Sequence, residues 1–212
     1  MKPELNRRDF LKIAGITGAA ALVACRASGI DKRMEEDMEP IRLAGQNGKR
    51  YLIAYSSKYG STAGIAKAIG EAWHTTGASV DVLPASEVDG FSGYDGALIG
   101  SPIYAGAWRQ DALSLVETNQ TVLQGMPVAY FAGCLTMASD DPQDIATAQT
   151  YCDAPAEIVT PASAPGIFAA KVDRAQINLV DRIILTVMRA NFGDHRRWDQ
   201  IEGWALSTIN NF

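Results

Sequence analysis

YLIAYSSKYGSTAGIAKAIGEAW, residues 51–73, predicts a buried β-strand, a short turn rich in hydroxyl groups and glycine, and an amphipathic helix. Ile65, Ile69 and Trp73 are four residues apart, so they share one helical face that can pack onto a sheet. The first N–H groups of a helix have no intrahelical partner and carry partial positive charge, which attracts phosphate. The sequence therefore predicts a phosphate-bearing ligand at this turn.

The chemistry of the turn narrows the choice of phosphate ligand. Gly60 lets a ligand approach the backbone closely, and no lysine follows it as the G-x-x-x-x-G-K-[ST] pattern of a nucleotide triphosphatase requires. The G-x-G-x-x-G pattern of a dinucleotide site is also absent. Four hydroxyl groups remain as donors: Ser56, Ser57, Ser61 and Thr62.

Residues 57–62, SKYGST, resemble the [ST]-x-[ST]-G-x-T turn with which flavodoxins bind the 5′-phosphate of FMN. Tyr59 departs from that pattern, although its hydroxyl can still donate a hydrogen bond. The alternative is an ordinary strand-to-helix turn whose small polar residues only cap the helix. The resemblance implies FMN as the cofactor and six phosphate-binding residues: Ser57, Lys58, Tyr59, Gly60, Ser61 and Thr62.

Strand and helix patterns alternate further along the chain. Apolar runs predict strands at 79–84, 94–100, 126–132 and 157–162, with helices at about 109–119 and 142–153. Together with the first unit, they predict a doubly wound, flavodoxin-like α/β fold: a five-stranded parallel sheet with helices on both faces. Ligands bind such sheets at the carboxyl ends of strands, where the chain order reverses. Three loops should therefore meet there: 56–62, 101–108 and 132–140.

The second loop, GSPIYAGAW at 100–108, bends through proline and glycine and presents two aromatic side chains. We expect Tyr104 to stack on the flat isoalloxazine ring of FMN, because aromatic stacking adds about 0.5–1.5 kcal/mol to area burial. The alternative is that Tyr104 and Trp108 only cover the core. The cofactor residues expected in this loop are Ser101, Pro102, Ile103, Tyr104, Ala105 and Gly106.

The third loop, AGCLTM at 132–137, lacks the aromatic residue that flavodoxins often carry there, so one ring face should stay open. We expect the backbone of Gly133, Cys134 and Leu135 to bind the pyrimidine edge of the ring. Lys58 places a positive charge nearby, which should raise the reduction potential relative to an all-acidic pocket. Both features point away from a carrier of very low potential.

The carboxyl-terminal part, 172–209, predicts a helix, a charged turn and a final amphipathic helix. It includes VDRIILTVMRANFGDHRRWDQIEGWALSTI. Taken with SSKYGST, IGSPIYAGAW and PGIFAAKVD, it is similar to the flavodoxin-like family that includes the menaquinone-dependent protoporphyrinogen oxidases. This resemblance covers nearly all of 50–212 and implies an FMN domain over 49–212 that passes electrons to a quinone. Three alternatives stay open: a protoporphyrinogen oxidase proper, an electron shuttle to a redox partner protein, and a non-catalytic binding or assembly factor.

The first residues carry an independent signal. Asn6–Lys12, NRRDFLK, precedes an apolar run at 13–24 and resembles a twin-arginine export signal. The run of about 12 residues is too short to cross a bilayer as a helix. Leu22–Cys25, LVAC, resembles a lipobox in which Cys25 becomes lipid-modified. We therefore expect a signal peptide over 1–25, a polar tether over 26–48, and a lipid anchor that holds the protein on the outer face of the cytoplasmic membrane or in the periplasm.

Composition excludes some other functions. Without residues 1–24 the chain carries 15 Lys and Arg against 22 Asp and Glu, an acidic balance that disfavours nucleic acid and anionic lipid surfaces. Neither His74 nor His195 has a neighbouring ligand at metal spacing, so no metal site is expected. Cys134 and Cys152 either form a disulfide or remain small buried thiols. No pattern indicates a catalytic acid, base or nucleophile, so the chemistry is assigned to the flavin.

Overall fold

The computed structural model describes residues 38–139, 141–187 and 190–212. The predicted signal peptide, with Cys25, and the first part of the predicted tether lie outside the described residues. Among the helices of the described part, none is both long and apolar enough to cross a membrane.

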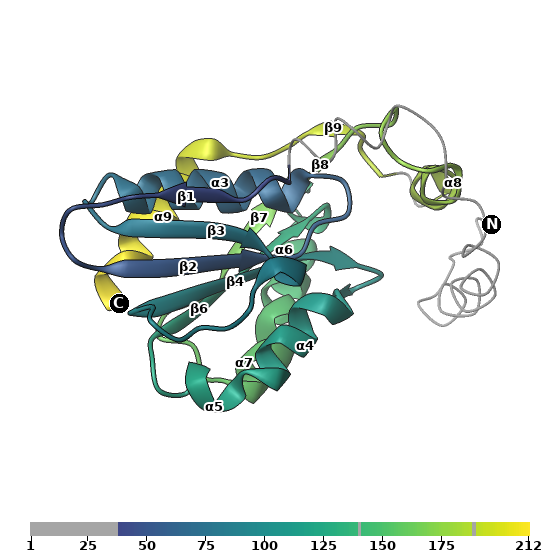
Figure 1. The fold of residues 1–212 in the computed structure, drawn as a ribbon. Coiled ribbons are helices and arrows are strands. Elements are labelled where there is room, and N and C mark those ends of the chain that lie inside the picture. Colours follow the sequence, from purple (N-terminus) through teal and green to yellow (C-terminus); the bar gives the residue numbers. More distant parts are fainter. Residues whose placement is uncertain (1–37, 140, 188–189) are drawn as a thin grey trace. The chain divides into compact units, whose positions relative to one another are not determined.

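A mostly parallel sheet forms the centre of the domain (Figure 1). The chain passes from β2 to β3 on one side and then to β4 on the other side, so its direction across the sheet reverses between β2 and β4. This order confirms the doubly wound, flavodoxin-like α/β fold. The five parallel strands, in spatial order, are β3 (Ser79–Pro84), β2 (Arg50–Tyr55), β4 (Gly96–Tyr104), β6 (Val128–Cys134) and β7 (Gly166–Ala169).

Two short antiparallel strands add to the five. β5 (Ala107–Trp108) folds back on β4, and β1 (Ile41–Leu43) pairs with β3 at the sheet edge. β1 lies inside the segment that was predicted to be a tether up to residue 48, so that boundary was wrong. A run of three residues is too short to show a strand period, and pairing with the exposed edge of β3 stabilises it.

Helices cover both faces of the sheet, as predicted (Figure 1). Helices α3 (Ser61–His74) and α9 (Trp198–Thr208) pack on one face. The other face is covered mainly by α4 (Gln110–Thr118), α5 (Gln120–Leu123) and α7 (Asp153–Ile158), with α6 (Pro142–Gln149) preceding α7. Short 3₁₀ turns lie at Ala85–Glu87, Thr136–Ala138, Thr150–Cys152 and Ile209–Asn211.

Helix α3 buries the apolar face that its sequence predicts. Ile65, Ile69 and Trp73 are fully buried in the core between α3, the sheet and α9. The indole Nε1 of Trp73 donates a hydrogen bond of 2.8 Å to the carbonyl oxygen of Ala205 in α9. Gly70 lets the helix approach β3, because a Cβ atom there would lie 2.5 Å from Cγ2 of Val82. Packing of this face fixes the helix and therefore the position of its N-terminus.

The strand predicted at 157–162 was wrong. Residues up to Ile158 belong to α7, Val159 follows the helix as a buried residue, and the fifth parallel strand is β7. The carbonyl oxygen of Val159 accepts a hydrogen bond of 2.9 Å from the hydroxyl of Tyr130, which fixes the end of α7 beneath the sheet. Packing thus overrides the β-propensity of a short run. The helix predicted at 142–153 is divided into α6 and α7 by a 3₁₀ turn.

An arm leaves the sheet between β7 and α9. Its strands β8 (Lys171–Val172) and β9 (Gly193–Asp194) pair antiparallel in a separate small sheet, and helix α8 (Leu179–Val187) lies between them in sequence. We call residues 171–197 the α8 arm. The predicted order of helix, charged turn and final helix is confirmed by α8 and α9.

Candidate cofactor site

The three loops expected at the site follow neighbouring strands. Tyr55 at the end of β2 is in register with Gly100 of β4, and Pro102 of β4 is in register with Gly133 of β6. Because the strands are parallel, their carboxyl ends meet at one edge of the sheet. The structure therefore brings together the predicted residues of all three loops.

The turn after β2 presents the N-terminus of α3. Gly60 precedes the helix with φ 75°, a left-handed conformation that glycine adopts without strain. No side chain caps this end of the helix, and its first turn contains no acidic residue. The positive end of the helix therefore has no compensating negative charge within its own first turn.

The hydroxyl groups of the turn differ in how they are bonded. Ser56 Oγ donates to the carboxylate of Asp111 at 2.8 Å, and Ser61 Oγ accepts the N–H of Lys171 at 2.8 Å. Ser57 Oγ is buried and has no hydrogen-bond partner. A buried polar group left in this state costs about 1–3 kcal/mol, and an anionic oxygen at the helix N-terminus would satisfy it. The turn therefore fits a phosphate-bearing cofactor, with Ser57 as its available hydroxyl.

Lys58 and Tyr59 contact a residue that sequence reasoning missed. The carboxylate of Asp181, in the first turn of α8, lies 2.7 Å from Nζ of Lys58 and accepts hydrogen bonds from the hydroxyls of Tyr59 and Tyr104. Asp181 is 4% exposed, and Asn178 Oδ1 accepts its backbone N–H. No local pattern could link Asp181 to Lys58, because 123 positions separate them in the sequence. The one sequence signal for this segment was the similarity of residues 172–209 to a known family.

The charges of this network balance one another. Burial raises the pKa of Asp181, but hydrogen bonds from Lys58, Tyr104 and Tyr59 lower it more, so the pKa lies below its ordinary value. Burial lowers the pKa of Lys58, but its bonds to Asp181 and Tyr104 raise it above its ordinary value. The pair is therefore ionised at neutral pH. The carboxylate of Asp181 offsets the positive charge of Lys58. Lys58 should therefore raise the reduction potential of the flavin less than its charge alone predicts.

The second loop forms the hairpin between β4 and β5. Tyr104 is 44% exposed, and the turn passes through Ala105 (φ 54°) and Gly106 (φ 81°), both left-handed. Ser101 is fully buried, and its hydroxyl accepts the N–H of Arg109 at 2.9 Å, so this side chain is bonded within the protein. Trp108 is 7% exposed and meets Tyr130 edge to face, in agreement with a role in the core.

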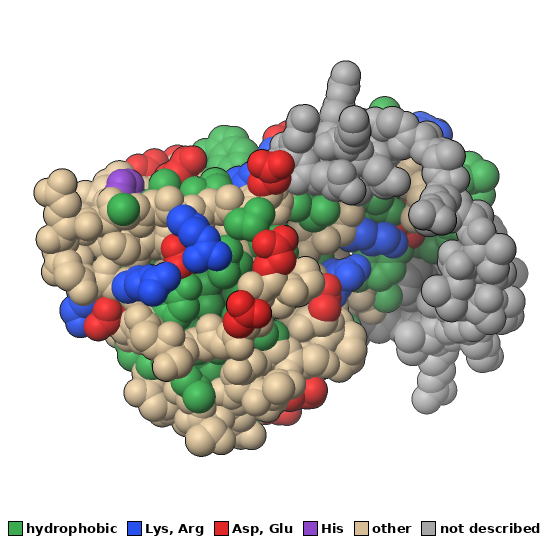
Figure 2. All heavy atoms as spheres, viewed as in Figure 1, with side chains coloured by type: hydrophobic (Ala, Val, Ile, Leu, Met, Phe, Trp, Pro, Cys, Tyr) green, Lys and Arg blue, Asp and Glu red, His purple; other side chains and the backbone are tan. Residues whose placement is uncertain are grey.

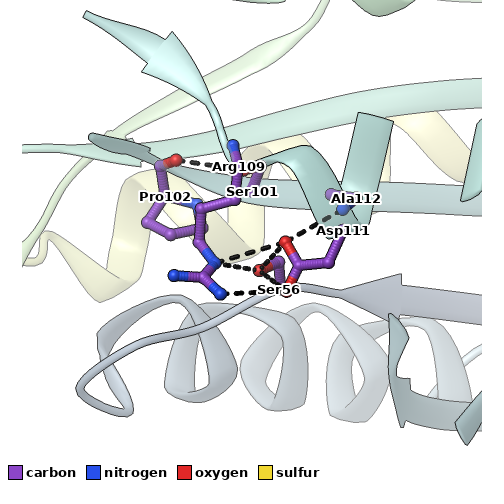
Figure 3. A network of polar contacts seen from close by, with 6 residues as sticks. All are labelled: Ser56, Ser101, Pro102, Arg109, Asp111 and Ala112. Atoms are coloured by element: carbon purple, nitrogen blue, oxygen red, sulfur yellow. Dashed lines mark hydrogen bonds and ion pairs between the residues drawn. The ribbon is translucent and has the colours of Figure 1, made fainter. Parts of the chain in front are cut away.

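A second polar network spans the point where the strand order reverses (Figure 3). Arg109 Nε donates to Ser56 Oγ at 2.7 Å, and the Arg109 guanidinium pairs with the Asp111 carboxylate at 3.1 Å. Burial raises the pKa of Asp111, but Arg109 and Ser56 lower it more. Sequence reasoning missed Arg109 and Asp111, whose signal is two opposite charges separated by one residue directly after the second loop. The network ties the second loop to the end of β2.

The third loop lies close to α3 and contains a buried thiol. Gly133 lies close to α3, because a Cβ atom there would be 3.2 Å from Thr62 Oγ1. Cys134 and Cys152 are free and buried, and burial raises the pKa of the Cys134 thiol to about 11. Beyond Leu135 the hydroxyls of Thr136 and Tyr151 lie 3.2 Å apart. An aromatic residue from the turn between α6 and α7 thus lies at this loop, where the loop sequence has none.

A hollow of about 360 Å³ opens beside the turn, on the side of β3. Acidic side chains are visible around the middle of this face in Figure 2, and the lining of the hollow includes Ser57, Glu39, Glu87 and Asp111.

Among the residues that the structure describes, no group of His, Cys, Asp and Glu is arranged to hold a metal ion.

Comparisons with known proteins agree with this geometry. A family model described as a flavodoxin domain matches residues 52–198, and a model of the twin-arginine translocation signal matches residues 4–24. A comparison with curated protein sequences found no match.

Solved structures show the same fold at low identity. A short-chain flavodoxin associated with a bacterial microcompartment aligns with a TM-score of 0.53 at 12% identity, covering 76% of this chain and 97% of that one. Flavodoxin 1 from Bacillus cereus aligns with a TM-score of 0.51 at 13% identity, covering 77% and 99%. The chain also spans 38% of the rubredoxin:oxygen oxidoreductase of Desulfovibrio gigas, with a TM-score of 0.46 at 14% identity.

The family match covers more than half of the chain and includes the turn, the second and third loops and the whole α8 arm. The fold, the uncapped helix N-terminus and the unpartnered Ser57 hydroxyl agree with it. The chain therefore belongs to the flavodoxin domain family, with FMN as its cofactor and a twin-arginine signal for export across the cytoplasmic membrane.

Proposed function

We propose that this chain is an exported FMN-dependent oxidoreductase that passes electrons to a quinone dissolved in the membrane. The observation that carries the cofactor assignment is the buried, unpartnered Ser57 hydroxyl beside the uncapped N-terminus of α3. Bound FMN supplies the transfer of a hydride or of single electrons at its N5 atom. The residues of the chain bind and orient it.

Each of the three loops has a distinct part in holding the cofactor. Ser57 and the first N–H groups of α3 bind the 5′-phosphate, and Gly60 leaves room for it to approach the backbone. Tyr104, in the second loop, is 44% exposed and has Lys58 Nζ 4.4 Å from its ring centre, so stacking on the flavin would use the opposite ring face. The backbone of Gly133, Cys134 and Leu135 binds the ring edge at the end of β6. Ser101 acts through its hydrogen bond to Arg109, which fixes the loop.

Three features support a quinone as the acceptor. The third loop itself carries no aromatic side chain after Phe131, and the aromatic residue beside it, Tyr151, meets Thr136 beyond Leu135. In this proposal Tyr151 stays outside the ring face that a flat acceptor approaches. Export across the cytoplasmic membrane, together with the proposed lipid anchor on Cys25, keeps the protein beside a membrane that contains quinones. The similarity to quinone-dependent oxidases in the motifs of residues 50–212 points to the same class of acceptor.

The proposal is tested with purified residues 26–212 in two steps. The protein should be yellow and should release FMN on denaturation. After reduction it should be reoxidised by a soluble menaquinone analogue much faster than free reduced FMN is under the same conditions. A flavin-bearing protein that the analogue does not reoxidise would contradict the quinone assignment and favour transfer to a protein partner.

Export and anchoring have their own test. Replacing Arg7 and Arg8 by lysine should retain the precursor in the cytoplasm, because the signal depends on this pair. Replacing Cys25 by serine should leave export intact and release the exported protein from the membrane fraction into solution. Export of the first variant at the normal rate would contradict the twin-arginine route, and lipid labelling of the second would contradict attachment at Cys25.

A further inference from the structure

Helix α8 exposes an apolar stripe, whereas the rest of the described domain buries most of its large apolar side chains. Four of its residues project from one side of the helix, at positions i, i+1, i+4 and i+8: Leu179, Val180, Ile183 and Val187. Their exposed fractions run from 43% to 67%, and they make up half of the exposed large apolar side chains among the described residues. A contiguous stripe of this kind marks an interaction surface.

The charge of the α8 arm differs from that of the remaining domain. Residues 171–197 contain six Lys and Arg against three Asp, whereas residues 38–170 contain six Lys and Arg against thirteen Asp and Glu. Asp181 pairs with Lys58, which lies outside the arm, and Asp194 pairs with Arg196 within it, so the arm keeps more Lys and Arg than Asp. The arm is therefore basic within an acidic protein. The acidic overall balance, which disfavours anionic lipid, does not describe this surface.

An exposed aromatic residue with a basic neighbour follows the arm at the start of α9. Trp198, directly after the arm, is 45% exposed, and the Arg196 guanidinium lies 4.4 Å from the centre of its ring. Trp198 lies beside α3, where a Cβ atom at Gly64 would be 3.9 Å from its ring, so it is not part of the α8 surface. Helices that lie in the headgroup layer place apolar side chains below and basic charges above, and the stripe of α8 and the basic residues of the arm match that composition.

The arm is attached firmly to the cofactor turn. Asp181, on the inner side of α8, binds Lys58 and the hydroxyls of Tyr59 and Tyr104, and the N–H of Lys171 donates to Ser61 Oγ. The inner side of the helix therefore faces the turn and the second loop, while the apolar stripe faces away. A surface bound by the stripe lies close to the mouth of the cofactor site.

We propose that α8 is a membrane-docking helix that inserts Leu179, Val180, Ile183 and Val187 into the interfacial layer of an anionic lipid bilayer. The stripe supplies apolar burial, the basic residues of the arm supply attraction to anionic headgroups, and Asp181 holds the helix beside the flavin site. This inference deepens the proposed function, because a quinone in the bilayer would then reach the flavin without leaving the lipid. Docking itself requires neither FMN nor electron transfer.

The test is vesicle binding by residues 26–212, which contain the whole described domain and lack the proposed lipid site at Cys25. The probes are phosphatidylcholine vesicles with and without phosphatidylglycerol. We expect the parent protein to bind the mixed vesicles and to lose most of this binding at high salt. An Ile183→Glu/Val187→Glu variant should bind them at least roughly tenfold more weakly than the parent does. Both changed residues are exposed, so melting of the variant should match that of the parent protein.

The matched control is Val122→Glu/Leu206→Glu, which adds the same charge at exposed apolar positions on α5 and α9. It should bind vesicles as the parent does. Equal loss in both variants, or absence of parent binding to anionic vesicles, would overturn the proposal. Formation of a dimer that only the α8 variant abolishes, without vesicle binding, would assign the stripe to a second copy of the chain and would also overturn it. These readouts do not involve flavin, so the quinone assignment can fail separately.

If Ile183→Glu/Val187→Glu fails to fold, Ile183→Ser/Val187→Ser gives the same comparison with a smaller change. It removes apolar area without adding charge, so a loss of vesicle binding would then come from the stripe itself. Binding unchanged from the parent would overturn the proposal.

Discussion

Helices α3 and α8 are both amphipathic, but they use their apolar faces in opposite ways. α3 buries Ile65 and Ile69 completely against the sheet, while α8 leaves Ile183 and Val187 more than half exposed. α3 presents its uncapped N-terminus to a ligand, whereas the first turn of α8 contributes a buried carboxylate that binds the same loop. A similar sequence pattern thus serves folding in one helix and, in our proposal, docking in the other. What separates them is the partner that each face meets.

The largest contrast should appear when one isoleucine from each helix is truncated. Ile69→Ala removes a fully buried side chain and should lower the free energy of unfolding by about 2–5 kcal/mol. Ile183→Ala changes a side chain that is 56% exposed and should cost less than about 0.5 kcal/mol. Urea unfolding of the two variants in parallel measures both values. A cost for Ile183 as large as that for Ile69 would mean that the stripe is buried within the protein.

The attachment of α8 to the cofactor turn should depend on Asp181. Asp181→Ala leaves Lys58 and the hydroxyls of Tyr59 and Tyr104 without their shared acceptor. We expect the free energy of unfolding to fall by about 1–3 kcal/mol. This is less than for a fully buried ion pair, because the Lys58 side chain is 32% exposed and water can solvate it. Hydrogen exchange should then rise across residues 177–187 while the sheet stays protected.

Asp199→Ala is the matched control for this change, because Asp199 occupies the first turn of α9 as Asp181 occupies that of α8. It removes the same favourable interaction with a helix N-terminus and no buried network. Equal exchange in both variants would show that the Asp181 network does not hold the arm.

Two buried hydroxyl groups without a partner, Ser57 and Ser163, allow a direct test of the phosphate site. Comparing their alanine variants separates loss of phosphate binding from the general effect of removing a buried hydroxyl. Ser57→Ala should weaken FMN binding by roughly tenfold, about 1–2 kcal/mol, because one phosphate oxygen loses a donor. Ser163→Ala removes another buried hydroxyl without a partner, ahead of the amino end of β7 and away from the turn, and should leave FMN affinity unchanged. Titration with FMN, followed by quenching of flavin fluorescence, compares the two. Similar affinities would place the phosphate elsewhere.

The smallest expected effect is the pH dependence of the α8 attachment. Because the pKa of Asp181 lies below its ordinary value of 3.8 in the folded protein, its contribution to stability is complete above that value. The contribution is lost as the pH falls below 3.8 and passes through the lowered pKa. Exchange of the α8 amides should therefore accelerate there in the parent protein and much less in Asp181→Asn. The same acceleration in both proteins would assign the effect to other carboxylates.

The sequence predicted the sheet and the cofactor turn well because their signals are local. Strand 79–84 agrees with β3 residue for residue, and the spacing of Ile65, Ile69 and Trp73 predicted the buried face of α3. The convergence of three loops followed from strand alternation, since parallel strands share one carboxyl edge. The predicted cofactor residues in those loops still await a binding measurement.

The errors arise where long-range packing decides the structure. The run 157–162 looks like a strand, but Val159 closes a helix because its carbonyl group meets the hydroxyl of Tyr130. β1 has only three residues and forms by pairing with β3. Asp181 joins the phosphate turn from across the chain, and no local pattern marks a carboxylate for such a role.

The central claim is that the end of this sheet binds FMN through its phosphate. The most direct measurement compares FMN with riboflavin, which has the same ring system and ribityl chain but no phosphate, by calorimetric titration of flavin-free residues 26–212. We predict tight binding of FMN and a dissociation constant for riboflavin at least about a hundredfold higher, because riboflavin cannot bind Ser57 and the N-terminus of α3 as an anion. Equal affinities for the two flavins, or binding of neither, would contradict the account.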